Sequence, residues 1–154
     1  LSKIQAKISE TFPPFLPKAP SGWSAGEIEK HTEAYTTESG SVRVSKVSRD
    51  YTKDDGDKRV EVTITNSPEI IRSYQAMVQA MDNPMVKSMG AMQDKKIESK
   101  GDWKLIIDDS DTDGKVGITA FHEQVVVEIS ETDEKTGREF LNLIDLDGLA
   151  EASR

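Results

Sequence analysis

The chain has no cysteine and only two histidines among its 154 residues. The absence of cysteine excludes disulfide bonds, thiolate metal sites and a thiol nucleophile. No apolar run approaches the roughly 20 residues of a membrane-spanning helix. His31 and His122 both fall in segments that we expect to be loops, and no G-x-S-x-G, H-E-x-x-H, P-loop or G-x-G-x-x-G motif is present. Enzymatic chemistry therefore has little support, and no cofactor is predicted.

The negative net charge argues against nucleic acid as a partner. The net charge is −8 at pH 7, and a nucleic-acid-binding surface needs clustered positive charge to contact phosphates. The same charge disfavours adsorption to anionic lipid. The hydrophobic fraction of 35% is nevertheless sufficient for a folded core. We expect an N-terminal helix and proline-rich strap over residues 1–20, followed by one domain over residues 21–154.

The central feature is a predicted amphipathic helix that begins after Ser67. Ser67 is a favourable N-cap, Pro68 suits the first helical position, and Asn83-Pro84 ends the helix. One apolar stripe recurs at helical spacing and consists of Ile70, Ile71, Tyr74, Met77, Val78 and Met81. This stripe is expected to cover a sheet.

Strand-like segments lie on both sides of that helix. Before it we predict a weak strand from Trp23 to about Lys30, a polar connection over residues 31–40, a strand with a bulge near Ser45, and a hairpin turn at residues 54–57. After it, apolar residues alternate in four short segments near residues 97, 103–107, 116–120 and 125–129. Turns this short predict an antiparallel meander.

A second helix is predicted near the end of the sequence. Thr132 or Asp133 caps it, and Phe140, Leu141 and Ile144 form its buried face. Leu149 is expected to end the fold, with frayed residues after it. The resulting order is β-β-β-α-β-β-β-β-α. Because strands come in runs, the predicted class is α+β, with an antiparallel sheet of about six or seven strands covered by two helices.

All five methionines lie between residues 77 and 92. Met77 and Met81 continue the helical stripe, and packing explains them better than a soft-metal site does. Met85, Met89 and Met92 follow Pro84 and have fewer predicted partners. Together with Phe15 of the strap, these three methionines are the candidate interaction surface.

The segment Asp109-Ser110-Asp111-Thr112-Asp113-Gly114 matches the opening of a calcium loop. Asp109, Asp111 and Asp113 would be the metal ligands. However, Ala120 occupies the twelfth position, where such a loop needs a glutamate, and the flanking residues are typical of strands. An Asp- and Gly-rich hairpin tip is the simpler interpretation.

The segments LPKAPSGWSAGE, SVRVSKVSRDYT, NPM at 83–85 and LNLIDLDGLAEA give a resemblance to known proteins. Together they resemble small uncharacterised exported proteins of Gram-negative bacteria. The resemblance implies a periplasmic location and a signal peptide removed before Leu1, although a boundary set during cloning explains Leu1 equally well. At the level of fold, the strand and helix order is similar to the PsbP-like α/β/α sandwich.

These observations favour a non-enzymatic periplasmic domain that binds a protein or a small ligand. The alternative is a calcium-binding or hydrolytic module that uses the Asp109–Asp113 loop.

Overall fold

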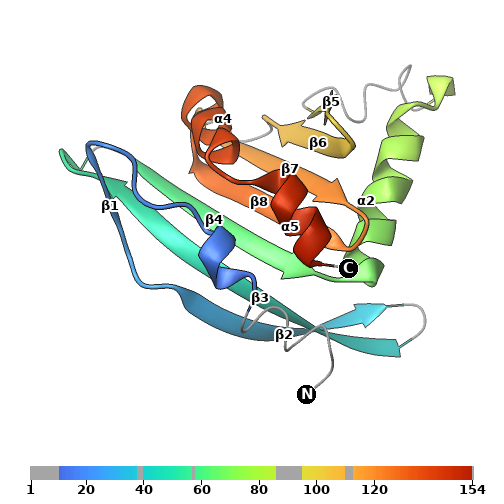
Figure 1. Ribbon diagram of the computed structural model, residues 1–154. Helices are drawn as coiled ribbons and strands as arrows, with labels where there is room; N and C mark the ends of the chain where they lie inside the picture. Colours follow the sequence, from blue (N-terminus) through green and yellow to red (C-terminus); the bar gives the residue numbers. More distant parts are fainter. Residues whose placement is uncertain (1–10, 38–39, 57, 86–94, 110–112, 154) are drawn as a thin grey trace.

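The computed structural model describes residues 11–37, 40–56, 58–85, 95–109 and 113–153 (Figure 1). Within them, eight strands form one antiparallel sheet, so the predicted α+β class is confirmed. The strands are β1 (Trp23–Ala25), β2 (Glu29–Thr37), β3 (Gly40–Lys53), β4 (Arg59–Asn66), β5 (Lys95–Lys100), β6 (Trp103–Asp108), β7 (Val116–His122) and β8 (Val125–Thr132). The helical elements are the 3-10 helix η1 (Pro13–Phe15) and the α-helices α2 (Pro68–Met81), α4 (Glu134–Asn142) and α5 (Leu146–Ala152).

The strand order across the sheet is β1-β3-β4-β8-β7-β6-β5, and β2 pairs with β3 beside β1. Four described strands therefore precede α2, where three were predicted. The difference is β2, because most of the predicted polar connection over residues 31–40 is paired with β3. Threonine suits strands, and the Thr32 and Ser45 hydroxyls lie 3.3 Å apart across this pair. His31 accordingly lies in a strand and not in a loop.

The predicted bulge near Ser45 is wrong. β3 pairs with β2 and with β4 without a register shift. Val44 and Val47 are both buried although they point to opposite faces, because both faces of this strand are covered. A register shift lies instead between β7 and β8, where Ser130 and Glu131 stand opposite Gly117. Glu131 takes a left-handed backbone conformation there, with φ of 70°.

One face of the sheet carries the main hydrophobic core, which α4 and α5 cover. Asp133 caps α4 by accepting a hydrogen bond from the Thr136 N–H at 3.1 Å, and the predicted buried face of α4 is confirmed. The expectation that the fold ends in frayed residues at Leu149 is wrong. Asp145 caps a further helix, α5, and Leu149 is fully buried in it. The Asp-x-x-Gly sequence at residues 145–148 is therefore a helix start.

The proline-rich strap crosses the same face and packs against the core. Phe12 and Leu16 are buried, and Phe15 is partly buried beside them. The Tyr51 hydroxyl donates a hydrogen bond to the Pro17 carbonyl oxygen at 2.5 Å. Burial raises the pKa of Tyr51 to about 12, so this donor keeps its proton at neutral pH. The strap is thus fixed by both apolar burial and a buried hydrogen bond.

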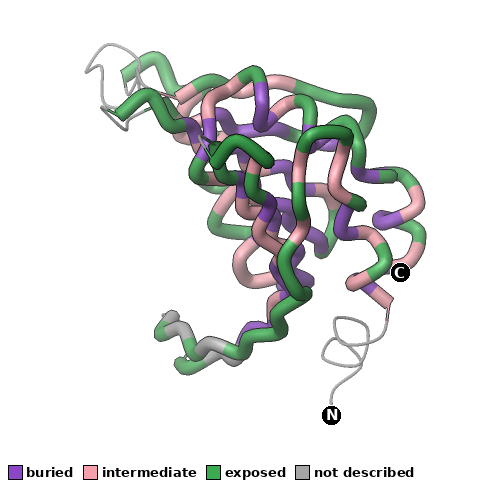
Figure 2. The backbone as a smooth tube through the Cα atoms, turned by 90° about the vertical axis from the view of Figure 1, so that its left-hand side faces the viewer, coloured by how far each residue is buried: buried purple, intermediate pink, exposed green. Residues whose placement is uncertain are grey.

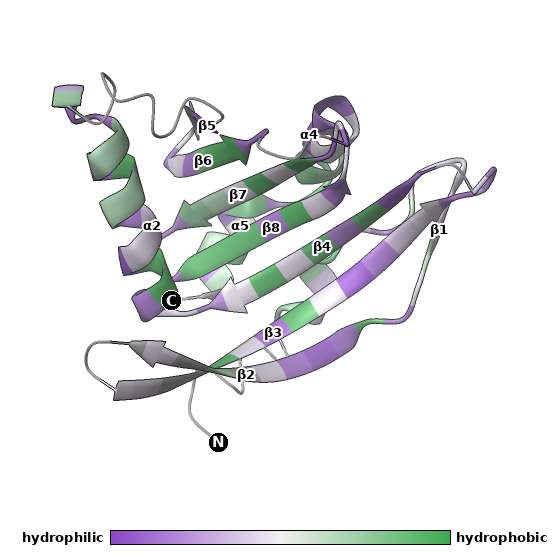
Figure 3. Ribbon diagram, turned by 180° about the vertical axis from the view of Figure 1, so that it is seen from behind, coloured by the Kyte–Doolittle hydropathy of each residue, from purple (hydrophilic) through white to green (hydrophobic). Residues whose placement is uncertain are grey.

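The other face of the sheet carries α2, which covers it at one end only (Figure 3). Beside α2, this face presents polar residues of the central strands, including Thr63, Thr119 and Glu128, and the Tyr74 hydroxyl of α2 donates a hydrogen bond to Glu128 at 3.5 Å. The β2–β3 hairpin extends beyond the other strands as a two-stranded ribbon with largely exposed residues (Figure 2). Within the described ranges, no helix has the length and apolar character needed to cross a membrane.

Candidate functional site

The candidate site is a depression of about 460 Å³ between α2 and the sheet, which we call the α2 groove. Its volume lies within the range of small-molecule and peptide sites, roughly 300–1,000 Å³. The groove is formed by one side of α2, by the start of β6 and by the turn between β7 and β8. The lining residues are Gln75, Val78, Gln79, Asp102, Lys104, Phe121, His122 and Glu123.

The position of α2 follows from its N-terminus. The Ser67 hydroxyl accepts a hydrogen bond from the Ile70 N–H, as predicted for an N-cap, and Pro68 occupies the first turn. The Ser67 N–H also donates to the Gln124 carbonyl oxygen at 2.9 Å, which ties the base of α2 to the β7–β8 turn. The helix therefore begins at the sheet edge where β7 and β8 are joined.

The stripe of α2 is only partly buried, and this partial burial creates the groove. Ile71 is buried at 2% exposure, whereas Tyr74, Met77 and Val78 are half-buried. They pack against a small cluster on the sheet that consists of Ile106, Phe121 and Val126. Because these three sheet residues are at most 4% exposed, the apolar surface that stays open is mainly that of the half-buried helix residues.

The floor of the groove is apolar. The rings of Tyr74 and Phe121 stack with centroids 5.8 Å apart and planes 20° apart. Burial raises the pKa of Tyr74 to about 12, and the neighbouring Glu128 carboxylate adds to this effect. Tyr74 is therefore neutral at physiological pH. Val78 extends the apolar surface from the helix side.

The rim of the groove is polar and carries both signs of charge. His122 follows Phe121 in β7 and points to the other face, where its ring centroid lies 5.7 Å from that of Trp103 in the main core; its Nε2 is 3.5 Å from Glu123 Oε1. The Lys104 ammonium donates to the Ser99 hydroxyl at 3.1 Å. Asp102, in the turn that precedes β6, contributes a second carboxylate beside that of Glu123. The rim can therefore form hydrogen bonds and ion pairs with a bound molecule.

Two glutamines complete the rim from the helix side. Gln75 and Gln79 are both exposed and lie one turn apart on α2. In the part of the chain that the structure describes, neither carboxamide has a hydrogen-bond partner. Each carboxamide offers two donors and one acceptor oxygen to a ligand. The groove lining contains no serine, threonine or cysteine, and its titratable side chains are His122, Asp102, Glu123 and Lys104.

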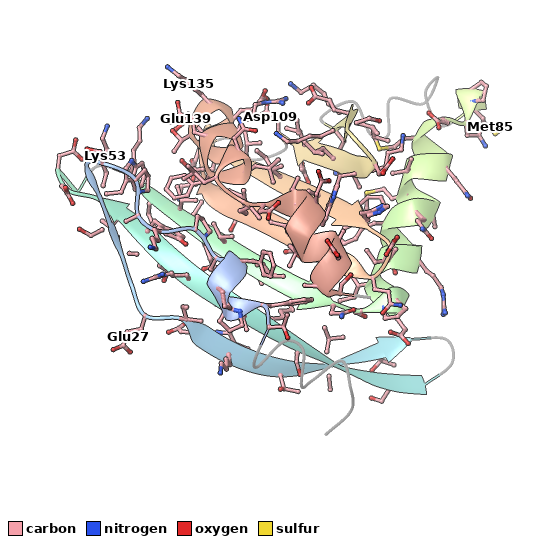
Figure 4. All side chains as sticks on the ribbon, viewed as in Figure 1. Glu27, Lys53, Met85, Asp109, Lys135 and Glu139 are labelled. Carbon is pink, nitrogen blue, oxygen red and sulfur yellow. The ribbon has the colours of Figure 1, made fainter. Side chains whose placement is uncertain are left out.

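The structure does not bring the predicted interaction residues together. Met85 is 71% exposed and lies beyond the far end of α2, pointing away from the sheet (Figure 4). Phe15 belongs to η1, which packs on the opposite face. Met89 and Met92 lie outside the described residues. Met85 follows the C-terminal end of α2 at Met81, and a role for it stays a prediction.

The calcium-loop candidate lies in the connection between β6 and β7. Asp109 and Asp113 are both exposed, and Asp111 lies outside the described residues. Among the residues described, no three carboxylate, histidine or cysteine side chains converge as metal ligands would. A calcium site at this loop stays a prediction without a geometric basis.

A second depression, of about 390 Å³, lies beside Asp113 and joins the two acidic turns of the sequence. Gly56 comes from the β3–β4 turn, and Asp113 and Gly114 come from the β6–β7 connection. Its charged side chains form pairs: Lys58 with Asp133 at 3.3 Å, and Lys115 with Glu131 at 3.4 Å. Because these charges already neutralise one another, this depression is a weaker candidate than the α2 groove.

The α2 groove was not identified from the sequence, although one signal of it was present. Apolar residues occur in adjacent positions at 105–107, 120–121 and 125–127. A strand buried on one face alternates apolar and polar residues, whereas adjacent apolar residues indicate burial on both faces. These runs mark where α2 covers the second face. The polar rim had no comparable signal, because His122 and Gln75 are brought together only by the folded chain.

Comparison with known proteins adds little to this geometry. No protein-family model matches the chain, and no curated protein shows significant similarity to it. Among solved structures, it is similar to a GTP binding regulator from Thermotoga maritima, with a TM-score of 0.45 and 8% sequence identity over 80% of this chain and 76% of that chain. A likeness at this level supports no conclusion about activity. The resemblance to exported proteins of Gram-negative bacteria also stays a prediction.

Proposed function

We propose that this protein is a non-enzymatic binding domain and that the α2 groove is its ligand-binding surface. The observation that supports the proposal is the composition of the groove. An apolar floor at Phe121 and Val78 lies beneath a rim of unpaired carboxamides and opposite charges. Ligand sites combine these two features, because apolar burial provides affinity and a few polar groups provide orientation.

A ligand screen by NMR tests the proposal. A library of small aromatic and aliphatic fragments is titrated into ¹⁵N-labelled protein, and backbone amide shifts are followed at the groove. We expect bound fragments to shift the amides of Gln79, His122 and Glu123. The Gln79→Trp variant should abolish these shifts, because the indole fills the groove.

The matched control is Ala76→Trp, which places the same side chain at an exposed position of α2 outside the groove lining. Fragments should still bind this variant. Equal binding to both variants, or a library with no ligand for the groove, would refute the proposal. The periplasmic location implied by the sequence resemblance is a separate part of the proposal. Fractionation of cells that make the native protein tests it.

A further inference from the structure

The pair Gln75 and Gln79 suggests what class of ligand the groove takes. Positions four apart on an α-helix are separated by about 6 Å along the axis. An extended peptide repeats every two residues, at about 6.6–6.8 Å. Two carboxamides at this spacing can each hydrogen-bond to the main chain of an extended segment, because each has donors and an acceptor that match a peptide unit.

The floor fits the same ligand. Alternate side chains of an extended peptide point in opposite directions, so one of them points toward the sheet when the main chain follows α2. That side chain meets the half-buried Val78 and the small part of Phe121, 4%, that stays exposed. Main-chain hydrogen bonds with an apolar side-chain pocket are the usual components of peptide recognition.

The charges on the rim favour a basic peptide. Asp102 and Glu123 carry two negative charges and Lys104 carries one positive charge, so the rim has a net negative charge; Lys104 donates to Ser99, and Glu123 lies 3.5 Å from His122 Nε2. The protein as a whole has a net charge of −8. Lysine or arginine beside the apolar residue therefore gains attraction both at the rim and over a longer range.

We propose that the α2 groove binds an extended peptide segment of a partner protein, with one apolar side chain against Val78 and a basic residue beside it. This inference depends on the proposed function, since it specifies the ligand of the same groove.

The test uses three probes on the whole ¹⁵N-labelled chain. The first is the acetylated and amidated peptide Gly-Lys-Phe-Lys-Gly, the second is Gly-Glu-Phe-Glu-Gly with the same end groups, and the third is indole. We expect the lysine peptide to shift the side-chain amide signals of Gln75 and Gln79. The double variant Gln75→Ala/Gln79→Ala should weaken its binding about tenfold or more, a change that the loss of two hydrogen bonds accounts for.

The control is Ser73→Ala, at an exposed position of α2 outside the groove lining, and it should bind as the unsubstituted protein does because it leaves the net charge unchanged. Equal affinity for the two peptides would overturn the basic preference. Binding of indole without either peptide would overturn the peptide inference and leave the proposed function standing. If no probe shifts the groove signals, the peptide inference fails. The proposed function fails with it only when the fragment library also gives no ligand.

Discussion

Replacing Thr65 by valine should stabilise the protein. Thr65 lies in β4 between Lys46 and Val126, at the end of the sheet that α2 covers, and is only 1% exposed. Its hydroxyl oxygen has no hydrogen-bond partner among the described residues. A buried hydroxyl without a partner costs about 1–3 kcal/mol relative to water. Valine has the same shape without the hydroxyl and suits strands equally well.

We therefore expect Thr65→Val to raise the free energy of unfolding by about 1 kcal/mol. For a chain of this size, that gain raises the melting temperature by roughly 2–4 °C. Urea unfolding followed by tryptophan fluorescence measures the change, because Trp103 is buried in the core. An unchanged dependence of free energy on urea concentration would show that the valine acts on stability alone.

The matched control is Thr63→Val, on the same strand and the same face but only half-buried. Its hydroxyl can reach water, so the substitution should change stability by less than about 0.5 kcal/mol. A loss of stability in Thr65→Val would refute the reasoning, because it would mean that the hydroxyl makes a favourable hydrogen bond in solution.

Four further predictions concern other parts of the protein. Ile71→Ala should destabilise the domain by about 2–4 kcal/mol in urea unfolding, because it leaves a cavity under α2; a loss below about 0.5 kcal/mol would contradict the assigned face. Burial raises the pKa of Asp133, but hydrogen bonds from Thr136 and Lys58 outweigh burial and lower it to about 2. The stability that this carboxylate contributes is therefore fully present above about pH 4 and is lost as the pH falls toward 2. The stability difference between the unsubstituted protein and Asp133→Ala should be largest above pH 4 and should shrink as the pH falls toward 2. Under mild peroxide, peptide mass spectrometry should detect sulfoxide at Met85 well before Met77; equal protection would remove the case for an exposed methionine surface. Millimolar Ca²⁺ should leave the melting temperature unchanged, since tight binding at 100 times Kd would add about 2.7 kcal/mol, and a rise abolished by Asp111→Ala would establish the calcium loop.

Local signals in the sequence predicted the elements that depend on neighbouring residues. Ser67-Pro68 predicts the start of α2, and Asp133 predicts the start of α4, because an N-cap acts within one helical turn. The turns at Gly101 and Gly114 were also predicted, and both glycines have positive φ. These features need no knowledge of the rest of the fold.

Features that depend on distant residues were missed. β2 contains few apolar residues and is a strand because β3 supplies its hydrogen-bonding partner. α5 was interpreted as a frayed end because Asp147-Gly148 is typical of a turn, although burial of Leu149 outweighs the cost of glycine in a helix. The groove combines residues from α2 with residues some 25 to 50 positions later, and sequence patterns report nothing about such distances.

The pairing of β4 with β8 has a consequence for the order of events in folding. Asn66 of β4 pairs with Val125 of β8, so the centre of the sheet joins residues about 60 positions apart. During synthesis, β4 and α2 leave the ribosome long before β8 does. The residues on which α2 packs, Phe121 and Val126, belong to β7 and β8 and are synthesised later. Until then the apolar stripe of α2 stays exposed. We therefore expect the segment up to α2 and the segment from β5 to β8 to acquire stable structure together, only when β8 pairs with β4.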